Sequence, residues 1–173
     1  KPCMIRRQKR HTTFADTVQH QKRAVFYSGH DDVTPIGDNV DLARTAEGVF
    51  TEDDWNETSS LEHQPYAYSK TLAEQEAWKI SKGQSRWDLV VVNPSLVLGP
   101  GINPRGTSES FNLVRQLGDG SMKSGAPDFY IGAVDVRDLA EAHFRAGYTP
   151  EAEGRHIISA ANTSLMELAS ILS

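Results

Sequence analysis

The chain has 173 residues, of which 38% are hydrophobic and 24% are charged, and its formal net charge is -5. These values fit one globular domain with an adequate core, and nothing in the sequence approaches a membrane span. No charged-then-apolar signal segment opens the chain, so we expect a cytoplasmic protein without a membrane partner. The single cysteine, Cys3, excludes an internal disulfide, and no His/Cys cluster has zinc-site spacing, so we expect no metal.

Residues 1–23 form a basic arm. They carry seven Lys or Arg residues against Asp16 alone, a net charge of +6, which leaves -11 for the remainder. A basic arm can bind nucleic acid or an anionic surface. An isolated arm is more commonly a solvated terminus, so we expect no nucleic-acid partner.

After the arm, a β-branched and aromatic run predicts a short buried strand at residues 24–28. Ser28 stands at the carboxyl end of this strand. Residues 50–55 are typical of a cap and a short turn, in which Thr51 is the N-cap and Trp55 is a packing anchor.

The clearest pattern predicts a helix at residues 65–82. A proline at its first position, lysines in its last turn and Gly83 after it indicate both ends. Side chains spaced by three or four residues form one stripe of this helix, and we expect the stripe to face a core: Tyr66, Lys70, Ala73, Ala77 and Ile80. A lysine in such a stripe is anomalous, because burying an ammonium costs roughly several kcal/mol unless an anion or an acceptor receives it.

The chemical interpretation is that Lys70 lowers the pKa of the Tyr66 phenol. A free phenol titrates at about pH 10, and a nearby cation favours its ionised form. The pair could then exchange a proton with a carbonyl or an alcohol. The plainer alternative is that Lys70 reaches out to water and that the spacing has no function.

A continuous apolar run at residues 87–94 predicts a strand buried on both faces, as in a parallel sheet covered by helices. Residues 94–101 follow as a loop at the carboxyl edge, where open parallel sheets bind their ligands. The remaining expected elements are a helix at 111–117, a strand at 129–134, a helix capped by Asp135, a strand at 155–159 and a last helix opened by a Ser164–Glu167 capping box. Strands and helices alternate, so the fold class is α/β.

His143 lies on the apolar face of the helix that follows Asp135. It invites a catalytic role. On an apolar face, however, a histidine is more commonly a core residue whose hydrogen bonds are satisfied, and we favour that interpretation.

Three blocks together resemble the extended short-chain dehydrogenase/reductase family, within the NAD-dependent epimerase/dehydratase superfamily. They are PYAYSKTLAE at residues 65–74, VVNPSLVLGP at 91–100 and VDVRDLAEAH at 134–143. The likeness is greatest to the branch of dihydroflavonol reductases and cinnamoyl-CoA reductases. It implies an incomplete Rossmann-like parallel sheet with flanking helices and part of a small C-terminal substrate-binding region. We divide the chain into the arm at 1–23, a Rossmann-like part at 24–101 and substrate-side elements at 102–173.

The resemblance also implies roles for individual residues. Tyr66 would exchange a proton with the substrate oxygen, while Lys70 would hold the nicotinamide ribose and favour the phenolate. Ser28 would orient the substrate, although counting back from Tyr66 puts the family serine nearer His30 or Asp31. Four residues would line the nicotinamide side through backbone groups: Pro94, Ser95, Leu96 and Val97. The implied reaction is hydride transfer from NADPH, or NADH, to a small aldehyde or ketone by a monomer or homodimer.

The sequence departs from the family in one respect. No glycine-rich phosphate-binding loop follows a strand, so the nucleotide-binding half is missing from this chain. We therefore expect the chain alone to be weak or inactive. Two alternatives stay open, a nucleotide-sugar epimerase or dehydratase of the same superfamily and a non-catalytic remnant or binding protein.

Overall fold

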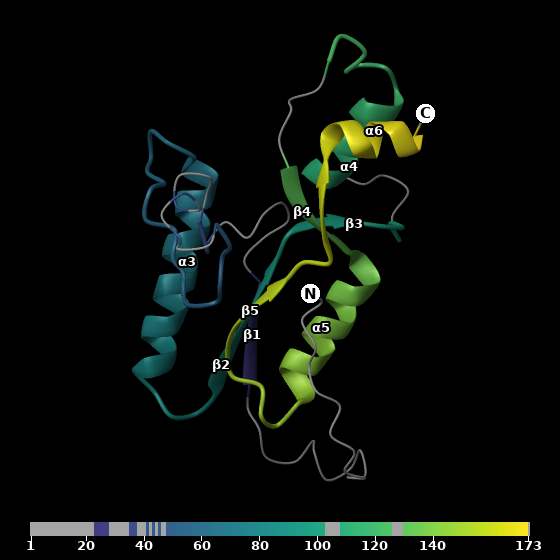
Figure 1. Cartoon of the computed structure of the whole chain (residues 1–173). Coiled ribbons are helices and arrows are strands. Elements are labelled where there is room, and N and C mark those ends of the chain that lie inside the picture. Colours follow the sequence, from purple (N-terminus) through teal and green to yellow (C-terminus); the bar gives the residue numbers. More distant parts are fainter. Residues whose placement is uncertain are drawn as a thin grey trace.

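The computed structural model of the chain describes residues 23–27, 35–37, 41, 43, 45, 48–102, 108–125 and 130–172. This part of the chain contains both strands and helices, as predicted (Figure 1), although at two places one strand follows another without a helix between them. In chain order they are β1 (Arg23–Tyr27), α3 (Pro65–Lys82), β2 (Asp88–Pro94), β3 (Leu96–Leu98), α4 (Glu109–Gly118), β4 (Tyr130–Asp135), α5 (Val136–Tyr148), β5 (Gly154–Ile158), β6 (Ala161–Ser164) and α6 (Leu165–Leu172). Residues 1–22 of the basic arm lie outside the described residues.

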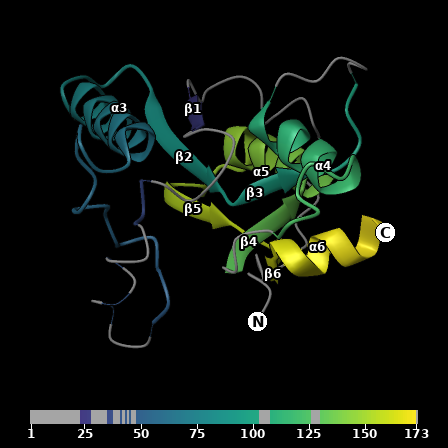
Figure 2. The same cartoon turned by 90° about the horizontal axis from the view of Figure 1, so that it is seen from above.

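The first sheet has the strand order β1-β2-β5, and all three strands are parallel. The central strand β2 is buried from Leu89 to Pro94, which agrees with its continuous apolar run. Val90 and Val92 pack against Leu139 and Ala146 of α5. The alternate side chains of the sheet point to the opposite face, which α3 covers (Figures 1 and 2).

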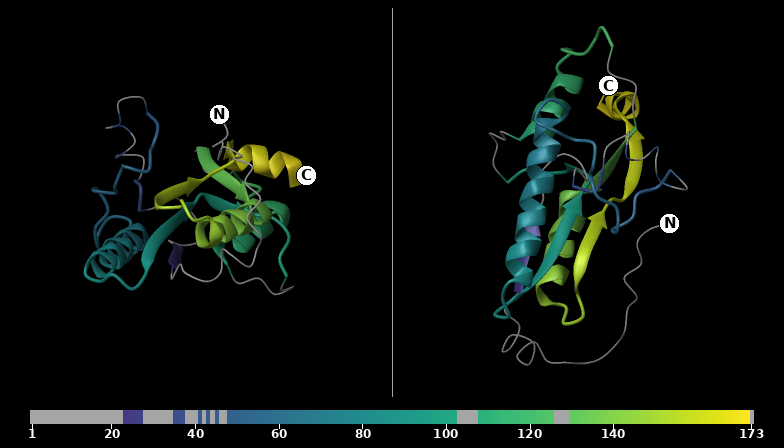
Figure 3. Two further views of the ribbon diagram at one scale, coloured as in Figure 1. Left: turned by 90° about the horizontal axis from the view of Figure 1, so that it is seen from below. Right: turned by 90° about the vertical axis from the view of Figure 1, so that its left-hand side faces the viewer.

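The second sheet has the order β3-β4-β6, with β3 parallel and β6 antiparallel to β4. The chain passes from β2 into β3 through Ser95 alone, so the two sheets are continuous (Figure 2). Helices α4 and α6 pack against each other beside this second sheet (Figure 3). No helix in the described part of the chain is both long and apolar enough to cross a membrane.

The prediction that residues 94–101 form a loop was wrong, because Leu96–Leu98 form the short strand β3. Strand β6, whose sequence is ANTS, was not predicted at all. Both strands are short, and their pairing with β4 satisfies backbone groups that the local sequence would leave in a loop. The extended conformation of these two segments therefore depends on the neighbouring strand β4 and not on their own sequence.

Several predicted helix ends agree with the structure, whereas the helix expected at residues 111–117 begins two residues earlier, at Glu109. Asp135 caps α5 by accepting a hydrogen bond from the backbone N–H of Arg137 at 2.8 Å. Ser164 and Glu167 form the expected capping box, with distances of 3.1 and 2.9 Å between side-chain oxygen and backbone nitrogen. Arg23 binds the carbonyl groups at the carboxyl end of α5, including that of Ala146 at 3.2 Å, and so ties β1 to this helix.

The prediction of which α3 side chains are buried was also wrong. The side chains that face the sheet are Ala67, Thr71 and Glu74, whereas Ala73 is exposed and Ile80 is 53% exposed. The helix is rotated relative to its apolar pattern because Glu74 finds a partner inside the protein. A count of apolar residues cannot detect a buried carboxylate of this kind.

Candidate active site

Tyr66 and Lys70 lie next to each other at the start of α3. The Lys70 Nζ atom lies 5.3 Å from the centroid of the Tyr66 ring, as expected for side chains four residues apart on a helix. Tyr66 is 46% exposed, and Lys70 is half-buried. The structure thus places the cation over the aromatic ring and leaves part of the phenol open to solvent.

This pair lies at the carboxyl edge of the first sheet. Helix α3 runs antiparallel to β2, so the first turns of α3 lie near the end of β2 (Figure 3, right). Farther along α3, Glu74 binds Arg155 near the start of β5, which fixes the same direction. Ligands of open parallel sheets bind at the carboxyl ends of the strands, so the position suits a ligand site.

The segment from Pro94 to Val97 is placed mainly inside the protein. Pro94, Ser95 and Leu96 are buried, and Val97 packs beside the core cluster against α5. The backbone N–H of Ser95 donates to the carbonyl of Ile158 at 3.1 Å. The side chains of the first three residues are therefore packed away, and a ligand could meet only their backbone.

Asn93 is a feature of this edge that the sequence analysis did not single out. It pairs with Ile157 on β5, so it lies on the same face as Arg155, the face covered by α3. Its side chain is fully buried, and neither its amide oxygen nor its amide nitrogen has a hydrogen-bond partner within the described ranges. A buried amide without partners costs about 1–3 kcal/mol, which makes Asn93 unusual.

Ser28 and His143 are the two other residues for which the sequence suggested a catalytic role. Ser28 lies outside the described residues. The Nδ1 atom of His143 lies 2.9 Å from the carbonyl oxygen of Leu139 within α5, and the ring is half-buried, which favours the core interpretation. Among the residues that the structure describes, no three His, Cys, Asp or Glu side chains are grouped in a way that could hold a metal.

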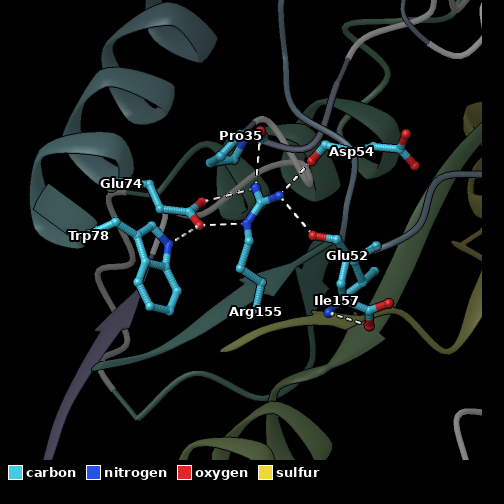
Figure 4. Close-up of polar contacts among 7 residues, drawn as sticks. All are labelled: Pro35, Glu52, Asp54, Glu74, Trp78, Arg155 and Ile157. Carbon is cyan, nitrogen blue, oxygen red and sulfur yellow. Dashed lines mark hydrogen bonds and ion pairs between the residues drawn. The ribbon is translucent and has the colours of Figure 1, made fainter. Parts of the chain in front are cut away.

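Among the residues that the structure describes, the most extensive polar cluster lies farther along α3, around Glu74 and Arg155 (Figure 4). Arg155 Nε is 2.6 Å from Glu74 Oε1, and Arg155 Nη2 is 3.2 Å from the other carboxylate oxygen. The two side chains are 7% and 0% exposed. Arg155 also stacks 3.8 Å from the centre of the Trp55 ring, which agrees with the expected role of Trp55 as an anchor.

Glu74 lies within the block at residues 65–74 that resembles the family, but the sequence predicted no role for it. A usable signal was present, because Glu74 has the helical spacing that places it with Ala67 and Thr71 on one face. Its partner is 81 residues away in the chain, so the pair itself could not be recognised before the fold was known.

Fold and site together define an α/β protein with a parallel sheet between helices and a tyrosine-lysine pair at the carboxyl edge. The model of the NAD dependent epimerase/dehydratase family matches residues 43–161. The chain therefore belongs to the NAD dependent epimerase/dehydratase family. This result confirms the family resemblance drawn from the three sequence blocks.

Several relatives of the chain are named as reductases. The chain is 35% identical over 135 residues to cinnamoyl-CoA reductase 1 of Arabidopsis thaliana, a match that covers 77% of this chain and 38% of that protein. It is 30% identical over 171 residues to NADPH-dependent methylglyoxal reductase GRE2 of Saccharomyces cerevisiae, which covers 91% of this chain and 48% of the relative. The chain thus spans less than half the length of either relative.

Solved structures agree with a Rossmann-like fold. Yeast methylglyoxal/isovaleraldehyde reductase Gre2 complexed with NADPH has a TM-score of 0.69 and 26% identity, covering 83% of this chain and 44% of that one. Thermus thermophilus UDP-glucose 4-epimerase in complex with NAD has a TM-score of 0.60 and 21% identity, covering 86% and 46%. The second likeness supports the fold only, and the predicted fold class is confirmed.

Proposed function

We propose that this chain is part of an NAD(P)-dependent oxidoreductase that reduces an aldehyde or a ketone, with Tyr66 and Lys70 as the acid-base pair. The observation that carries the proposal is the position of Lys70 Nζ, 5.3 Å from the centre of the Tyr66 ring, at the carboxyl edge of a parallel sheet. The names of the two reductase relatives support the same chemistry. Since this chain spans less than half of each relative, the activity is proposed for a protein that also supplies the rest of the fold.

In this proposal Tyr66 donates its phenolic proton to the carbonyl oxygen of the substrate. The tyrosine O–H bond breaks, an O–H bond forms on the product alcohol, and the phenolate that remains is stabilised by the ammonium of Lys70. When bound, the nicotinamide supplies the hydride that reduces the carbonyl carbon. Ser28 would orient the substrate through its hydroxyl group.

The residues at the edge fit a nicotinamide cofactor. In the described ranges Lys70 has no carboxylate partner, so its N–H groups are available to the hydroxyls of a ribose. The backbone of four consecutive residues would meet the nicotinamide, since most of their side chains are packed inside: Pro94, Ser95, Leu96 and Val97. These contacts do not select between NADP and NAD.

Cofactor binding is tested by titrating NADPH into this chain and into an N-terminally extended form, with the fluorescence of the reduced cofactor as the signal. We expect binding by the extended form and about tenfold weaker binding after Lys70→Met, because an ionic hydrogen bond is lost. Lys79→Met is the matched control, since Lys79 is an exposed lysine of the same helix that pairs with Glu76 at 3.1 Å. No binding by the extended form would overturn the assignment.

Catalysis is tested with Tyr66→Phe in the extended form. We expect NADPH binding to be retained and turnover of aldehydes to be abolished, because the proton donor is missing. Turnover that persists in this variant removes Tyr66 from the mechanism.

A second candidate follows from the family itself, which includes epimerases and dehydratases. Parallel assays with aldehydes, ketones and nucleotide sugars separate the two functions, and turnover of nucleotide sugars alone would replace the first proposal. A non-catalytic binding protein would turn over neither class. The cytoplasmic location and the monomeric or homodimeric state stay predictions.

A further inference from the structure

We propose that a pocket near the carboxyl end of α3 binds planar aromatic carboxylates. The pocket has a volume of about 570 Å³ and is lined by six residues: Trp55, Gln75, Trp78, Lys79, Lys82 and Arg155. Trp78 lies twelve residues after Tyr66 on the same helix, which corresponds to about 18 Å along the helix axis. The site is therefore separate from the acid-base pair, and the inference does not depend on the proposed function.

Two indole rings form the apolar wall of this pocket. Trp55 belongs to the segment before α3 and Trp78 to the helix itself, and both residues are half-buried, so part of each stays exposed. Exposed apolar surface that is also concave is typical of a ligand site. Aromatic rings stack on other planar rings, so the two indoles favour a planar ligand.

Both indole rings are held by the buried ion pair of Glu74 and Arg155. Arg155 Cζ lies 3.8 Å from the centre of the Trp55 ring. Trp78 Nε1 donates a hydrogen bond to Glu74 Oε1 at 3.1 Å (Figure 4). Arg155 is fixed in turn, because it also donates to the backbone carbonyl of Glu52 at 3.0 Å. The wall is thus ordered before a ligand arrives, which lowers the entropic cost of binding.

The charges around the pocket favour an anion. Of the six described residues that line it, three are cationic and none is acidic. Arg155 is neutralised by Glu74, and Lys79 pairs with Glu76 at 3.1 Å. In the described ranges Lys82 has no carboxylate partner, so its positive charge is uncompensated. The carboxyl end of a helix carries about half a negative charge, which this ammonium outweighs.

The polar side chains of the pocket are suited to a carboxylate. Gln75, Lys79 and Lys82 are spaced by four and three residues, so they lie on one face of α3. A carboxylate only accepts hydrogen bonds, and the ammonium and amide N–H groups of these residues are donors. A ligand with its ring against the indoles and its carboxylate at this row of donors uses both parts of the pocket.

Two indole rings could also enclose a quaternary ammonium, as aromatic cages do. The three cationic side chains that line this pocket oppose such a ligand. A second pocket of about 840 Å³ shares Trp78 and Arg155, but it would repel an anion because five acidic residues line it: Glu52, Asp53, Asp88, Glu151 and Glu153. Charge therefore assigns the aromatic anion to the smaller pocket.

The test follows the indole N–H signals of the chain by NMR of 15N-labelled tryptophan while 2-naphthoate is added. The chain has three tryptophans, of which only Trp87 is not part of the pocket lining, and Trp87→Phe identifies its signal. We expect the other two signals to shift together and to saturate with a dissociation constant of about 1 mM or less. The Trp87 signal should not move.

Two analogues of the probe separate the contributions of charge and ring. Naphthalen-2-ylmethanol keeps the planar rings and loses the charge, so we expect it to bind about two- to fivefold more weakly. Decalin-2-carboxylate keeps the charge and loses the aromatic rings, so we expect binding that is about two- to tenfold weaker. Equal binding of all three compounds would overturn the proposal.

Lys82→Met tests the contact with the anion at an exposed residue whose replacement leaves the core intact. We expect this variant to bind 2-naphthoate no better than the alcohol. Lys123→Met is the matched control, because Lys123 is an exposed lysine outside the pocket lining, and it should keep the preference for the anion. Trp78→Leu should weaken binding of 2-naphthoate about fivefold or more. If Trp78→Leu does not fold, Lys82→Met and the two analogues decide the question.

Three results would overturn the proposal. The first is that the indole signals do not move at about 10 mM 2-naphthoate, tenfold above the expected dissociation constant. The second is that all three signals move alike, which indicates unspecific association. The third is that Lys82→Met leaves the preference for the anion unchanged.

Discussion

Arg155 and Glu74 form an ion pair inside the protein, with Nε 2.6 Å from Oε1 and with side chains that are 7% and 0% exposed. Both charges have been removed from water, so each depends on the other for compensation. Loss of one partner leaves an uncompensated buried charge, whereas loss of both leaves none. The two kinds of substitution should therefore differ greatly in their effect on stability.

The first prediction concerns this difference. Arg155→Met should lower the free energy of unfolding by about 3–5 kcal/mol, because the Glu74 carboxylate is left unpaired. Glu74→Met/Arg155→Met should recover most of this loss. Urea denaturation of the single and double variants gives the two values. Lys79→Met serves as the control for an exposed pair, with a change of at most about 1 kcal/mol. If the double variant loses as much free energy of unfolding as Glu74→Met and Arg155→Met lose together, the prediction is wrong.

The second prediction concerns two buried asparagines that differ in the hydrogen bonding of their side chains. The amide of Asn93 has no partner in the described part of the chain, whereas the Asn56 side-chain oxygen accepts a hydrogen bond from Ser59 N at 3.0 Å. Asn93→Leu should raise the free energy of unfolding by about 1–3 kcal/mol, and Asn56→Leu should lower it by a similar amount. Thermal unfolding of the two variants measures both effects. Destabilisation by Asn93→Leu would show that its amide is hydrogen-bonded in solution.

The third prediction concerns the close approach of Gly99 to α5. Gly99 has a φ of +130°, and a Cβ atom there would lie 2.9 Å from Val136 Cγ1. Gly99→Ala should therefore cost about 1–3 kcal/mol in backbone strain and overpacking. Gly118 is the matched control, because a Cβ atom there meets nothing within 4 Å. Gly118→Ala should be neutral or slightly stabilising in the same urea experiment, and equal effects of the two variants would refute the argument.

Local chemistry made much of this fold predictable. The helix at 65–82 has a proline at its start and Gly83 at its end, and the buried strand at 88–94 has a continuous apolar run. The capping box of Ser164 and Glu167 needs only three residues of separation. Each of these signals is contained in a short stretch of sequence.

The features that could not be predicted depend on distant partners. Leu96–Leu98 becomes a strand because β4 lies beside it, and Glu74 faces the sheet because Arg155 receives it. The helical pattern of α3 favoured Ala73 and Ile80 as buried residues, since it gave no weight to Glu74, whose partner is distant in the chain. The tyrosine-lysine pair was accessible to prediction because its two members belong to one helix.

The last prediction concerns pH and the start of α5. Hydrogen bonds from the side chain and then the backbone of Arg137 lower the pKa of the Asp135 carboxyl from 3.8 to about 2. A carboxylate whose pKa is lower in the folded state stabilises the fold above its unfolded pKa, and this contribution is lost as the pH falls through the folded pKa. The stability that Asp135 supplies should therefore be complete above about pH 5 and should disappear between about pH 4 and pH 2.

Asp135→Asn isolates this effect, because asparagine keeps the cap of α5 but cannot ionise. The difference in urea midpoint between the unmodified chain and this variant should be constant above about pH 5 and should shrink towards zero near pH 2. In the background of Arg137→Met the same comparison should give a smaller pH dependence, since the principal cause of the lowered pKa has been removed. A difference that is independent of pH would mean that Asp135 acts as a neutral cap, with no contribution from its pairing with Arg137.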